Sequence, residues 1–362
     1  IIFTVTNDLS YDQRMIRICT SLANAGYDVT LIGRKMKASV PLSQKPYKQK
    51  RLSCFFEKGK LFYTAYNIRL FFFLLFKKMD GICAIDLDTI LPCYYISRLK
   101  KIKRIYDAHE YFSQQKEIVT RPGIYKFWHA IEKKYVPKFP NGYTVGHFIA
   151  AEFNKNYGVN YKVIRNLPLL KNEATKSFLI NDKKIIIYQG AVNEARGLEF
   201  LIPAMKNINA VLHIYGDGNF VEETRRIIST NNLADKVFMK GKLLPEQLDT
   251  ISSHAFIGIN LVENNGLNQY YSLANKFFDL IQHAIPQVTM DFPEYKKIND
   301  EFEVAILITD LQILTIENAI NKLLSDENLY RSLQQNCLTA RKTLNWQHEE
   351  KKLISFYKNI FG

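Results

Sequence analysis

The segment SLANKFFD (residues 272–279), followed by HAIP (residues 283–286), opens a helix between two apolar strands. We expect these strands at Ile257–Leu261 and at Gln287–Met290. A strand, a helix and a second apolar strand in this order are the repeating unit of a parallel sheet with helices on its faces. The segment therefore predicts an α/β fold.

The start of this helix also predicts an anion site. A helix N-terminus offers unpaired N–H groups and about half a unit of positive charge, which suits phosphate. Lys276 adds a full charge, and the carboxylate of Asp279, one turn further on, can accept hydrogen bonds from ribose hydroxyls. These residues indicate a nucleoside-diphosphate site, although a core helix capped by Ser272 or Asn275 would explain them too.

Strands and helices alternate along the whole chain, whose 362 residues are too many for one compact core. We expect strands at Ile1–Thr6, Asp28–Ile32, Gly81–Ile85, Lys103–Tyr106, Gly142–Val145 and Tyr161–Ile164, then at Lys184–Tyr188, Ala210–Tyr215, Val237–Met239, Ile257–Leu261, Gln287–Met290 and Ala305–Ile308. This pattern predicts two Rossmann-like, doubly wound parallel-sheet domains with a ligand cleft at their carboxyl ends. The domains are expected at residues 1–165 and 183–345, with a linker at 166–182 and a final amphipathic helix at 346–362.

The charge of the chain is concentrated in its first half. Residues 1–165 hold 28 Lys and Arg against 12 Asp and Glu, a net charge of +16, whereas residues 166–362 hold 21 against 23, a net charge of −2. This asymmetry indicates an anionic partner for the first domain: a membrane surface, an anionic substrate or a nucleic acid. We expect no nucleic acid, because the sequence has no helix-turn-helix, RNA-binding or zinc-finger pattern. The five cysteines are scattered without a CxxC pair, which favours a cytoplasmic setting and no zinc site.

A strongly apolar segment, LFYTAYNIRLFFFLLF, covers residues 61–76. Asn67 and Arg69 interrupt it, and the uncharged run after Arg69 is too short to span a bilayer. Basic residues precede the segment and Lys77 and Lys78 follow it. It is either a buried helix of the first domain or an interfacial helix resting on anionic lipid.

Two glycine turns follow expected strands of the second domain. Gly190 lets a ligand approach the backbone closely. Arg196, further along the same turn, can donate two parallel hydrogen bonds to phosphate oxygens. Gly216, Asp217 and Gly218 end the next strand with a turn where a nucleotide can lie against bare backbone. Both patterns also occur in ordinary turns and on ordinary surfaces.

Polar residues also follow strand ends in the first domain. His109 follows the expected strand Lys103–Tyr106, so it points toward the expected cleft, where it can contact a sugar hydroxyl or orient a reacting group. Glu110, Asp107, Asp86 and Asp88 also lie at strand ends. Each of these side chains can line the cleft, or can instead cap a helix or form a hydrogen bond to a neighbouring loop.

Taken together, these segments resemble the family 4 retaining glycosyltransferases of the GT-B fold, and in particular a bacterial surface-polysaccharide branch. The resemblance covers nearly the whole chain and rests on Asn7–Arg14, residues 26–32, Asp86–Pro92, Asp107–Phe112, Gly190–Gly197, Gly216–Gly218, Ser272–Pro286 and the terminal helix. It implies that the first domain binds the acceptor, that the second binds the donor, and that the helix at 346–362 crosses back onto the first domain. It implies transfer of a sugar from a nucleoside-diphosphate-sugar to an acceptor hydroxyl with retention, in capsule, exopolysaccharide or lipopolysaccharide synthesis. It also implies a cytoplasmic protein, peripheral on the inner face of the membrane, with a glycan or lipid-linked acceptor.

The resemblance gives the candidate residues their roles. His109, Arg196 and Lys276 are expected to be catalytic, and Asp12, Arg14 and Glu110 to lie on the acceptor side. The donor is expected to contact Gly190, Gly216, Asp217, Gly218, Ser272, Leu273, Asn275 and Asp279. No cofactor or metal is expected, because the two cations and the helix start can stabilise the departing diphosphate.

The sequence departs from the family pattern in the donor half. The two Glu of the broader family fall on Tyr271 and Asp279, so that the first carboxylate is missing and the second is one methylene shorter. The basic residue often seen after the first glycine is Ala191. The missing carboxylate at Tyr271 therefore leaves a non-catalytic nucleotide-sugar binder as an alternative. A nucleotide-sugar epimerase is a second alternative, because it would have the same architecture.

Overall fold

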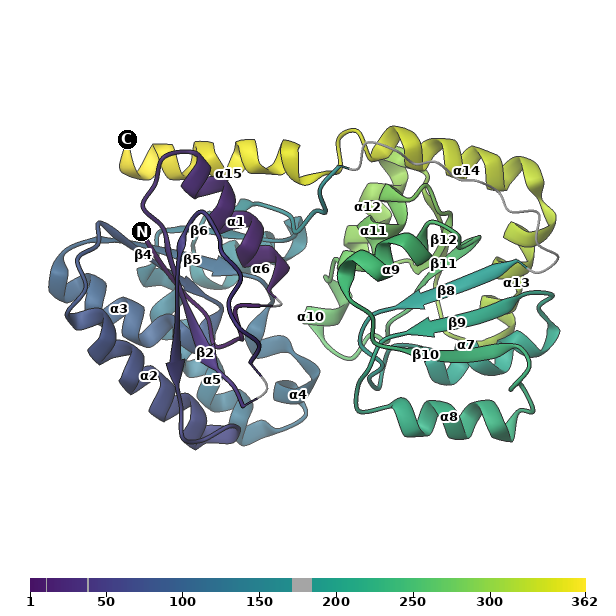
Figure 1. Ribbon diagram of the computed structural model, residues 1–362, viewed down its shortest axis with the longest axis horizontal. Coiled ribbons are helices and arrows are strands. Elements are labelled where there is room, and N and C mark those ends of the chain that lie inside the picture. The colour runs from purple at the N-terminus through teal and green to yellow at the C-terminus, as the bar shows by residue number, and fades with distance from the viewer. Residues whose placement is uncertain (11, 38, 171–183) are drawn as a thin grey trace. The chain divides into compact units, whose positions relative to one another are not determined.

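The computed structural model describes residues 1–10, 12–37, 39–170 and 184–362, which form two compact units (Figure 1). Unit 1 contains Ile1–Asn166, Gly266–Asn268 and Gln347–Gly362, and unit 2 contains Leu167–Asn265 and Gln269–Trp346. Positions 171–182 of the expected linker lie outside the described residues. Each unit has one parallel sheet with helices on its faces, which confirms the predicted fold class.

Unit 1 contains a seven-stranded sheet in the order β3-β2-β1-β4-β5-β6-β7, in which every pairing is parallel. The strands are β1 (Ile2–Thr4), β2 (Thr30–Lys35), β3 (Lys48–Ser53), β4 (Gly81–Ile85), β5 (Lys103–Ala108), β6 (Asn141–Thr144) and β7 (Lys162–Val163). Strand β3 was not predicted, because its sequence KQKRLS buries only Leu52 and lacks an apolar pattern. Its lysines suit its place at the edge of the sheet, where they discourage further pairing.

The helices of unit 1 cover both faces of this sheet. They are α1 (Gln13–Asn24), α2 (Gly59–Leu75), α3 (Ile90–Lys100), α4 (Lys116–Val119), α5 (Pro122–Tyr135) and α6 (His147–Tyr157), with 3₁₀ turns at Leu87–Thr89, Phe112–Gln114 and Val136–Lys138. The predicted apolar segment forms α2, which lies beside α3 (Figure 1). No helix in the described ranges is long and apolar enough to cross a membrane.

The last helix of the chain, α15 (Trp346–Phe361), packs against unit 1. Tyr357 is fully buried, with its ring 5.9 Å from that of Phe3 in β1. Gly81, at the start of β4, makes room for the helix, because a Cβ there would lie 2.3 Å from Cζ of Phe361. The end of the chain therefore completes the core around the first strand.

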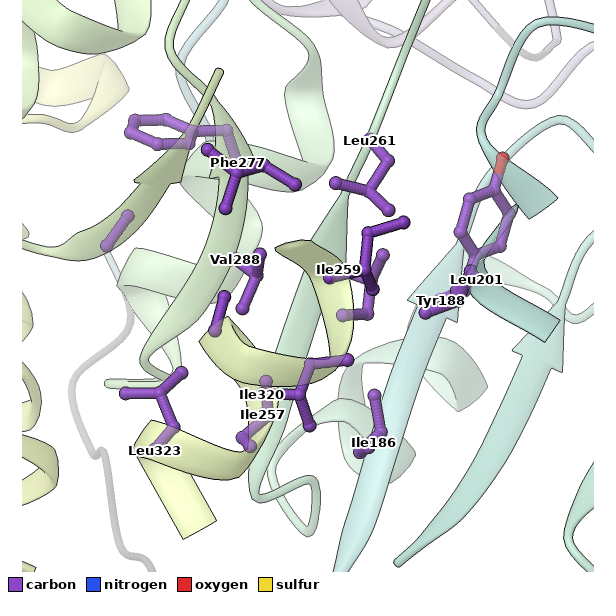
Figure 2. Close-up of a cluster of buried hydrophobic side chains, with 14 of the residues drawn as sticks. Ile186, Tyr188, Leu201, Ile257, Ile259, Leu261, Phe277, Val288, Ile320 and Leu323 are labelled. Carbon is purple, nitrogen blue, oxygen red and sulfur yellow. The ribbon is translucent and has the colours of Figure 1, made fainter. Parts of the chain in front are cut away.

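Unit 2 contains a six-stranded sheet in the order β10-β9-β8-β11-β12-β13, again with every pairing parallel. Its strands are β8 (Ile185–Gln189), β9 (Val211–Tyr215), β10 (Val237–Gly241), β11 (Ile257–Asn260), β12 (Gln287–Met290) and β13 (Ala305–Ile308). Figure 2 shows apolar side chains of the central strands, such as Ile186, Ile259 and Val288, packed with Leu201 and Ile320 from two helices. This core holds the strand ends, and hence the loops after them, in place.

Seven α-helices complete the described part of unit 2, together with the second half of α10, whose first two residues belong to unit 1. With α10 included, they are α7 (Leu198–Ala204), α8 (Val221–Thr230), α9 (Pro245–Ser252), α10 (Leu267–Tyr270), α11 (Asn275–Gln282), α12 (Pro293–Phe302), α13 (Ile313–Ser325) and α14 (Glu327–Ala340), with a 3₁₀ turn at Met205–Asn207. Helix α11 is the helix that SLANKFFD was expected to open. It begins at Asn275, with Ala274 as its N-cap and no side-chain cap, so neither Ser272 nor Asn275 caps it.

Candidate functional site

The glycine turns after β8 and β9 pack against each other. A Cβ on Gly216 would lie 1.8 Å from the carbonyl oxygen of Gly190, and one on Gly218 would lie 2.2 Å from that of Val192. Gly216 and Gly218 are therefore needed for close packing of the two turns, whereas a Cβ on Gly190 would meet nothing within 4 Å. Asp217 lies between these glycines, and its carbonyl accepts a 3.0 Å hydrogen bond from the N–H of Val192.

Lys276 lies in the first turn of α11, over the aromatic ring of Tyr188 in β8. Its Nζ is 4.1 Å from the ring centroid of Tyr188, whose hydroxyl donates a 2.7 Å hydrogen bond to the carbonyl of Ala191. Burial, with a smaller contribution from the charge of Arg196, lowers the pKa of Lys276 to about 7. The lysine therefore titrates near neutrality, and an anion beside it would favour its charged form.

Arg196 is held by an unusual stretch of backbone between β8 and α7. Ala195 has a φ of +64° and Gly197 a φ of +72°, so two left-handed residues flank the arginine. The carbonyl of Ala195 accepts a 3.0 Å hydrogen bond from the N–H of Glu263, which follows β11. Within the described residues, neither Arg196 nor Lys276 forms an ion pair, so the two cations lack a counter-charge.

The other predicted donor residues lie around the start of α11. The N–H of Ser272 donates to the carbonyl of Gln269, and Leu273 packs against the core of unit 2. Asn275 is exposed, and Asp279 is half-buried one turn into the helix. These residues lie at or near the same helix start as Lys276.

A pair of acidic side chains in unit 2 was not anticipated from the sequence. Burial raises the pKa of Glu199, in the first turn of α7, and a hydrogen bond with Glu263 raises it further. Asn265 donates a 2.8 Å hydrogen bond to Glu263. Burial and the hydrogen bond with Glu263 therefore favour the protonated form of Glu199, which follows the turn that holds Arg196. The only sequence signal was the placement of the two acids after a glycine turn and after a strand.

In unit 1, His109 lies between two carboxylates after β5. Its Nε2 is 3.0 Å from Oδ2 of Asp107, its Nδ1 is 4.0 Å from Oδ2 of Asp86, and its side chain is 16% exposed. Burial lowers the pKa of His109, but the negative charge of Asp107, helped by that of Asp86, raises it by more, to about 8. His109 is therefore mainly an imidazolium at neutral pH.

Arg14, expected on the acceptor side, lies in the core of unit 1 and is only 3% exposed. Its guanidinium donates to Asp107 at 2.9 Å and to the carbonyl of Ile164 at 2.9 Å. Burial raises the pKa of Asp107, but the charges of Arg14 and His109 outweigh it, so the pKa lies below its usual value. Arg14 thus keeps Asp107 ionised, and Asp107 in turn holds the ring of His109.

Two further acids lie beside this histidine. Asp86 adopts a φ of +54°, and its Oδ1 accepts the backbone N–H groups of His109 at 2.8 Å and Glu110 at 3.2 Å. Burial raises the pKa of Asp86 well above its usual range and that of Asp88 to about 6. A left-handed non-glycine residue is costly and occurs preferentially at functional sites.

The remaining acceptor-side candidates lie near the surface of unit 1. Asp12 is the N-cap of α1 and accepts a 3.0 Å hydrogen bond from the N–H of Met15. Glu110 is exposed and accepts a hydrogen bond from Gln115. Within the described ranges, no three His, Cys, Asp or Glu side chains gather as metal ligands.

Comparison with solved structures identifies the architecture. Sucrose-phosphate synthase from Thermosynechococcus elongatus is similar with a TM-score of 0.80 and 16% identity, over 99% of this chain and 98% of that one. HepE of Anabaena in complex with UDP-glucose gives 0.77 and 11%, over 99% of both chains. WaaG, a glycosyltransferase involved in lipopolysaccharide biosynthesis, gives 0.76 and 12%, over 100% of this chain and 99% of that one.

These matches and the two parallel sheets define the GT-B fold of glycosyltransferases, as the sequence predicted. Residues 171–339 also match the family model described as Glycosyl transferases group 1. Apart from Gly266–Asn268, this matched range lies within unit 2 and covers most of it. No curated protein sequence matches the chain significantly.

Proposed function

We propose that the protein is a retaining glycosyltransferase that moves a sugar from a nucleoside-diphosphate-sugar to an acceptor hydroxyl. The observation that carries this proposal is the pair of Lys276 and Arg196 beside the uncapped start of α11, without a carboxylate partner in the described part of the chain. Two unpaired cations at a helix N-terminus match the charge of a diphosphate.

In this proposal the cations act on the leaving group. Negative charge grows on the diphosphate as the bond to the anomeric carbon breaks, and Lys276, Arg196 and the helix start stabilise that charge. Because these groups supply the positive charge, we propose that the reaction needs no metal. His109, whose pKa of about 8 keeps it protonated, would contact the transferred sugar as a hydrogen-bond donor.

Similar solved structures guide the choice of substrate. Solved structures of HepE contain UDP and UDP-glucose, so we propose a UDP-sugar as the first donor to test. WaaG is involved in lipopolysaccharide biosynthesis, which agrees with a role in bacterial surface-polysaccharide synthesis. The net charge of +16 in residues 1–165 supports a peripheral location on the cytoplasmic face of the membrane, where a lipid-linked acceptor would be presented.

The first experiment is a thermal-shift panel of UDP, GDP, ADP, CMP and their sugar conjugates, each with EDTA and then with Mg²⁺. A ligand at a hundred times its dissociation constant adds about 2.7 kcal/mol of stability. We expect a metal-independent rise with UDP in the wild type and in Lys297→Ala, which removes an exposed lysine of α12. In Lys276→Met, which keeps the aliphatic packing over Tyr188 but removes the charge, the rise should be largely lost.

Turnover with the stabilising nucleotide-sugar then tests the reaction. Lys276→Met should lower the rate on the order of 10²–10³-fold, equivalent to about 2–4 kcal/mol, and NMR of the product should show the donor's anomeric configuration. Near-native turnover of Lys276→Met would count against the assignment. Nucleotide binding without transfer would indicate a binder, and a change of sugar configuration without an acceptor would indicate an epimerase.

A further inference from the structure

Helix α2 is apolar on two opposite faces. Phe62, Tyr66, Leu70 and Leu74 recur every fourth residue and are buried against the rest of unit 1. On the other side, Leu61, Ile68, Phe72 and Phe76 are 62%, 54%, 57% and 82% exposed. A helix on the surface of a globular protein normally carries polar residues on its outer face. We call the four exposed residues the α2 ridge.

The neighbouring helix, α3, also carries exposed apolar side chains. Nζ of Lys100, the last residue of α3, donates a 3.0 Å hydrogen bond to the carbonyl of Lys77, just after α2. Leu99 precedes this lysine and is exposed, as is Tyr95 one turn earlier. Exposed apolar side chains therefore occur on both of these packed helices, whereas such residues are normally scattered singly over the surface of a monomer.

Between residues 58 and 79, a range that spans α2, every charged residue is a cation. Five cations, Lys58, Lys60, Arg69, Lys77 and Lys78, lie between Glu57 and Asp80, and no acidic residue lies between those two positions. All five cations are exposed. The cores of protein–protein interfaces are depleted in lysine, whereas an apolar face bordered by lysines is typical of helices that lie in a lipid interface.

We propose that the α2 ridge is the surface by which the protein docks on an anionic phospholipid bilayer. Helix α2 would lie parallel to the membrane, with Phe72 and Phe76 at the boundary of the acyl chains and Lys77 and Lys78 among the phosphates. The inference rests on the proposed function only for the place of the membrane in the reaction. The surface itself follows from the exposure and charge of these residues.

The test is vesicle flotation of the full chain at low salt, with phosphatidylcholine vesicles that contain or lack phosphatidylglycerol. Wild type should float only with phosphatidylglycerol. Phe72→Ser/Phe76→Ser should weaken binding at least tenfold, and Lys77→Gln/Lys78→Gln about 25-fold, since each cation near such a surface is worth about 1 kcal/mol, or fivefold. The matched control is Ile313→Ser/Leu314→Ser, which removes two exposed apolar side chains of unit 2 and should float like wild type.

Several results would overturn the proposal: no flotation of wild type, equal flotation with both kinds of vesicle, or unchanged flotation of Phe72→Ser/Phe76→Ser. Self-association in sedimentation that this double variant abolishes, without lipid binding, would instead assign the ridge to a second copy of the chain. The UDP thermal shift of each variant is measured in parallel. An intact shift shows that the variant is folded, and it separates failure of docking from failure of the donor site.

Discussion

Lys276 combines a low pKa with a place where an anion is expected, and this makes ligand binding sensitive to pH. In the free protein its pKa is about 7, because burial and Arg196 disfavour the charged form. A bound diphosphate favours the charged form and must raise this pKa. Binding is therefore coupled to the uptake of a proton whenever the pH lies between the two values.

We predict that affinity for UDP falls as the pH rises from 7 to 9, by up to about tenfold per pH unit, since one pKa unit equals about 1.36 kcal/mol. Isothermal titration calorimetry in two buffers with different ionisation enthalpies should show uptake of about one proton per UDP at pH 8. In Lys276→Met the affinity should be weak and nearly independent of pH. A wild-type affinity that stays constant over this range would contradict the coupling.

The charge of His109 is predicted to depend on Asp107. Asp107→Asn removes the carboxylate that raises the pKa of the histidine, so this pKa should fall from about 8 toward 6.5 or below. Asp86→Asn should lower it less, because that carboxylate is 4.0 Å from the ring rather than 3.0 Å. NMR titration of the imidazole protons measures both shifts.

The Asp107→Asn variant also leaves Arg14 buried without its counter-charge, which costs about 3–5 kcal/mol. If this variant does not fold, Arg14→Met/Asp107→Asn removes both charges and tests the same shift. A His109 pKa that stays near 8 in the folded variant would show that Asp107 does not set the charge of the ring.

At the scale of elements, the close packing of the two glycine turns after β8 and β9 predicts that a side chain at Gly216 destabilises the protein. Gly216→Ala should destabilise the protein by about 2–5 kcal/mol, since it combines the strain of a φ of +154° with a Cβ 1.8 Å from a carbonyl oxygen. Gly26→Ala is the control, because its φ is +94° but nothing lies within 4 Å of the new Cβ. It should cost only about 1–2 kcal/mol.

Chemical denaturation measures both variants, and the slope of each curve verifies that the same surface unfolds. Equal losses for the two glycines would mean that backbone strain alone matters and that the close packing of the turns does not. A larger loss for Gly216→Ala would instead explain why the turn after β9 contains glycine whether or not a nucleotide lies against it.

Elements that bury an apolar face could be predicted from the sequence. Strands β4, β12 and β13 have the expected bounds, because each is a short apolar run between turn residues. Strand β3 could not be found this way, since as an edge strand it buries only one side chain. The alternation of apolar and polar residues in a strand reflects which side chains are buried. An edge strand that buries few side chains therefore shows no clear apolar pattern in its sequence.

The candidate site was predictable only in part, for a related reason. Residues at strand ends and at the start of α11 could be located from local patterns. The buried pair of Arg14 and Asp107 joins positions 93 residues apart, and Glu199 and Glu263 meet only through the packing of two loops. No local spacing encodes such partnerships, and the same holds for the pKa shifts that depend on them.

For the whole molecule, the two units should respond to pH in opposite directions. The pKa of His109 in unit 1 is raised from 6.5 to about 8, so its contribution to stability is present below pH 6.5 and is lost as the pH rises through 8. The pKa of Lys276 in unit 2 is lowered from 10.5 to about 7. The penalty of burying its charge is therefore relieved as the pH rises above 7.

The chain's two tryptophans report on the units separately, since Trp128 lies in unit 1 and Trp346 in unit 2. Between pH 7 and 9, the thermal midpoint seen by Trp128 in Trp346→Phe should fall, and that seen by Trp346 in Trp128→Phe should rise. UDP at pH 7 should raise only the second midpoint. Identical midpoints at every pH would show instead that the units unfold as one.

The packing of α15 on unit 1 has a consequence for how the chain is made. Domains generally fold as they leave the ribosome, the N-terminal one first. Here the core around β1 includes Tyr357, so the first unit to emerge is the last whose core can close. Until α15 is translated, apolar surface around Phe3 stays uncovered, and we expect chaperones to bind a nascent chain that stalls before this helix.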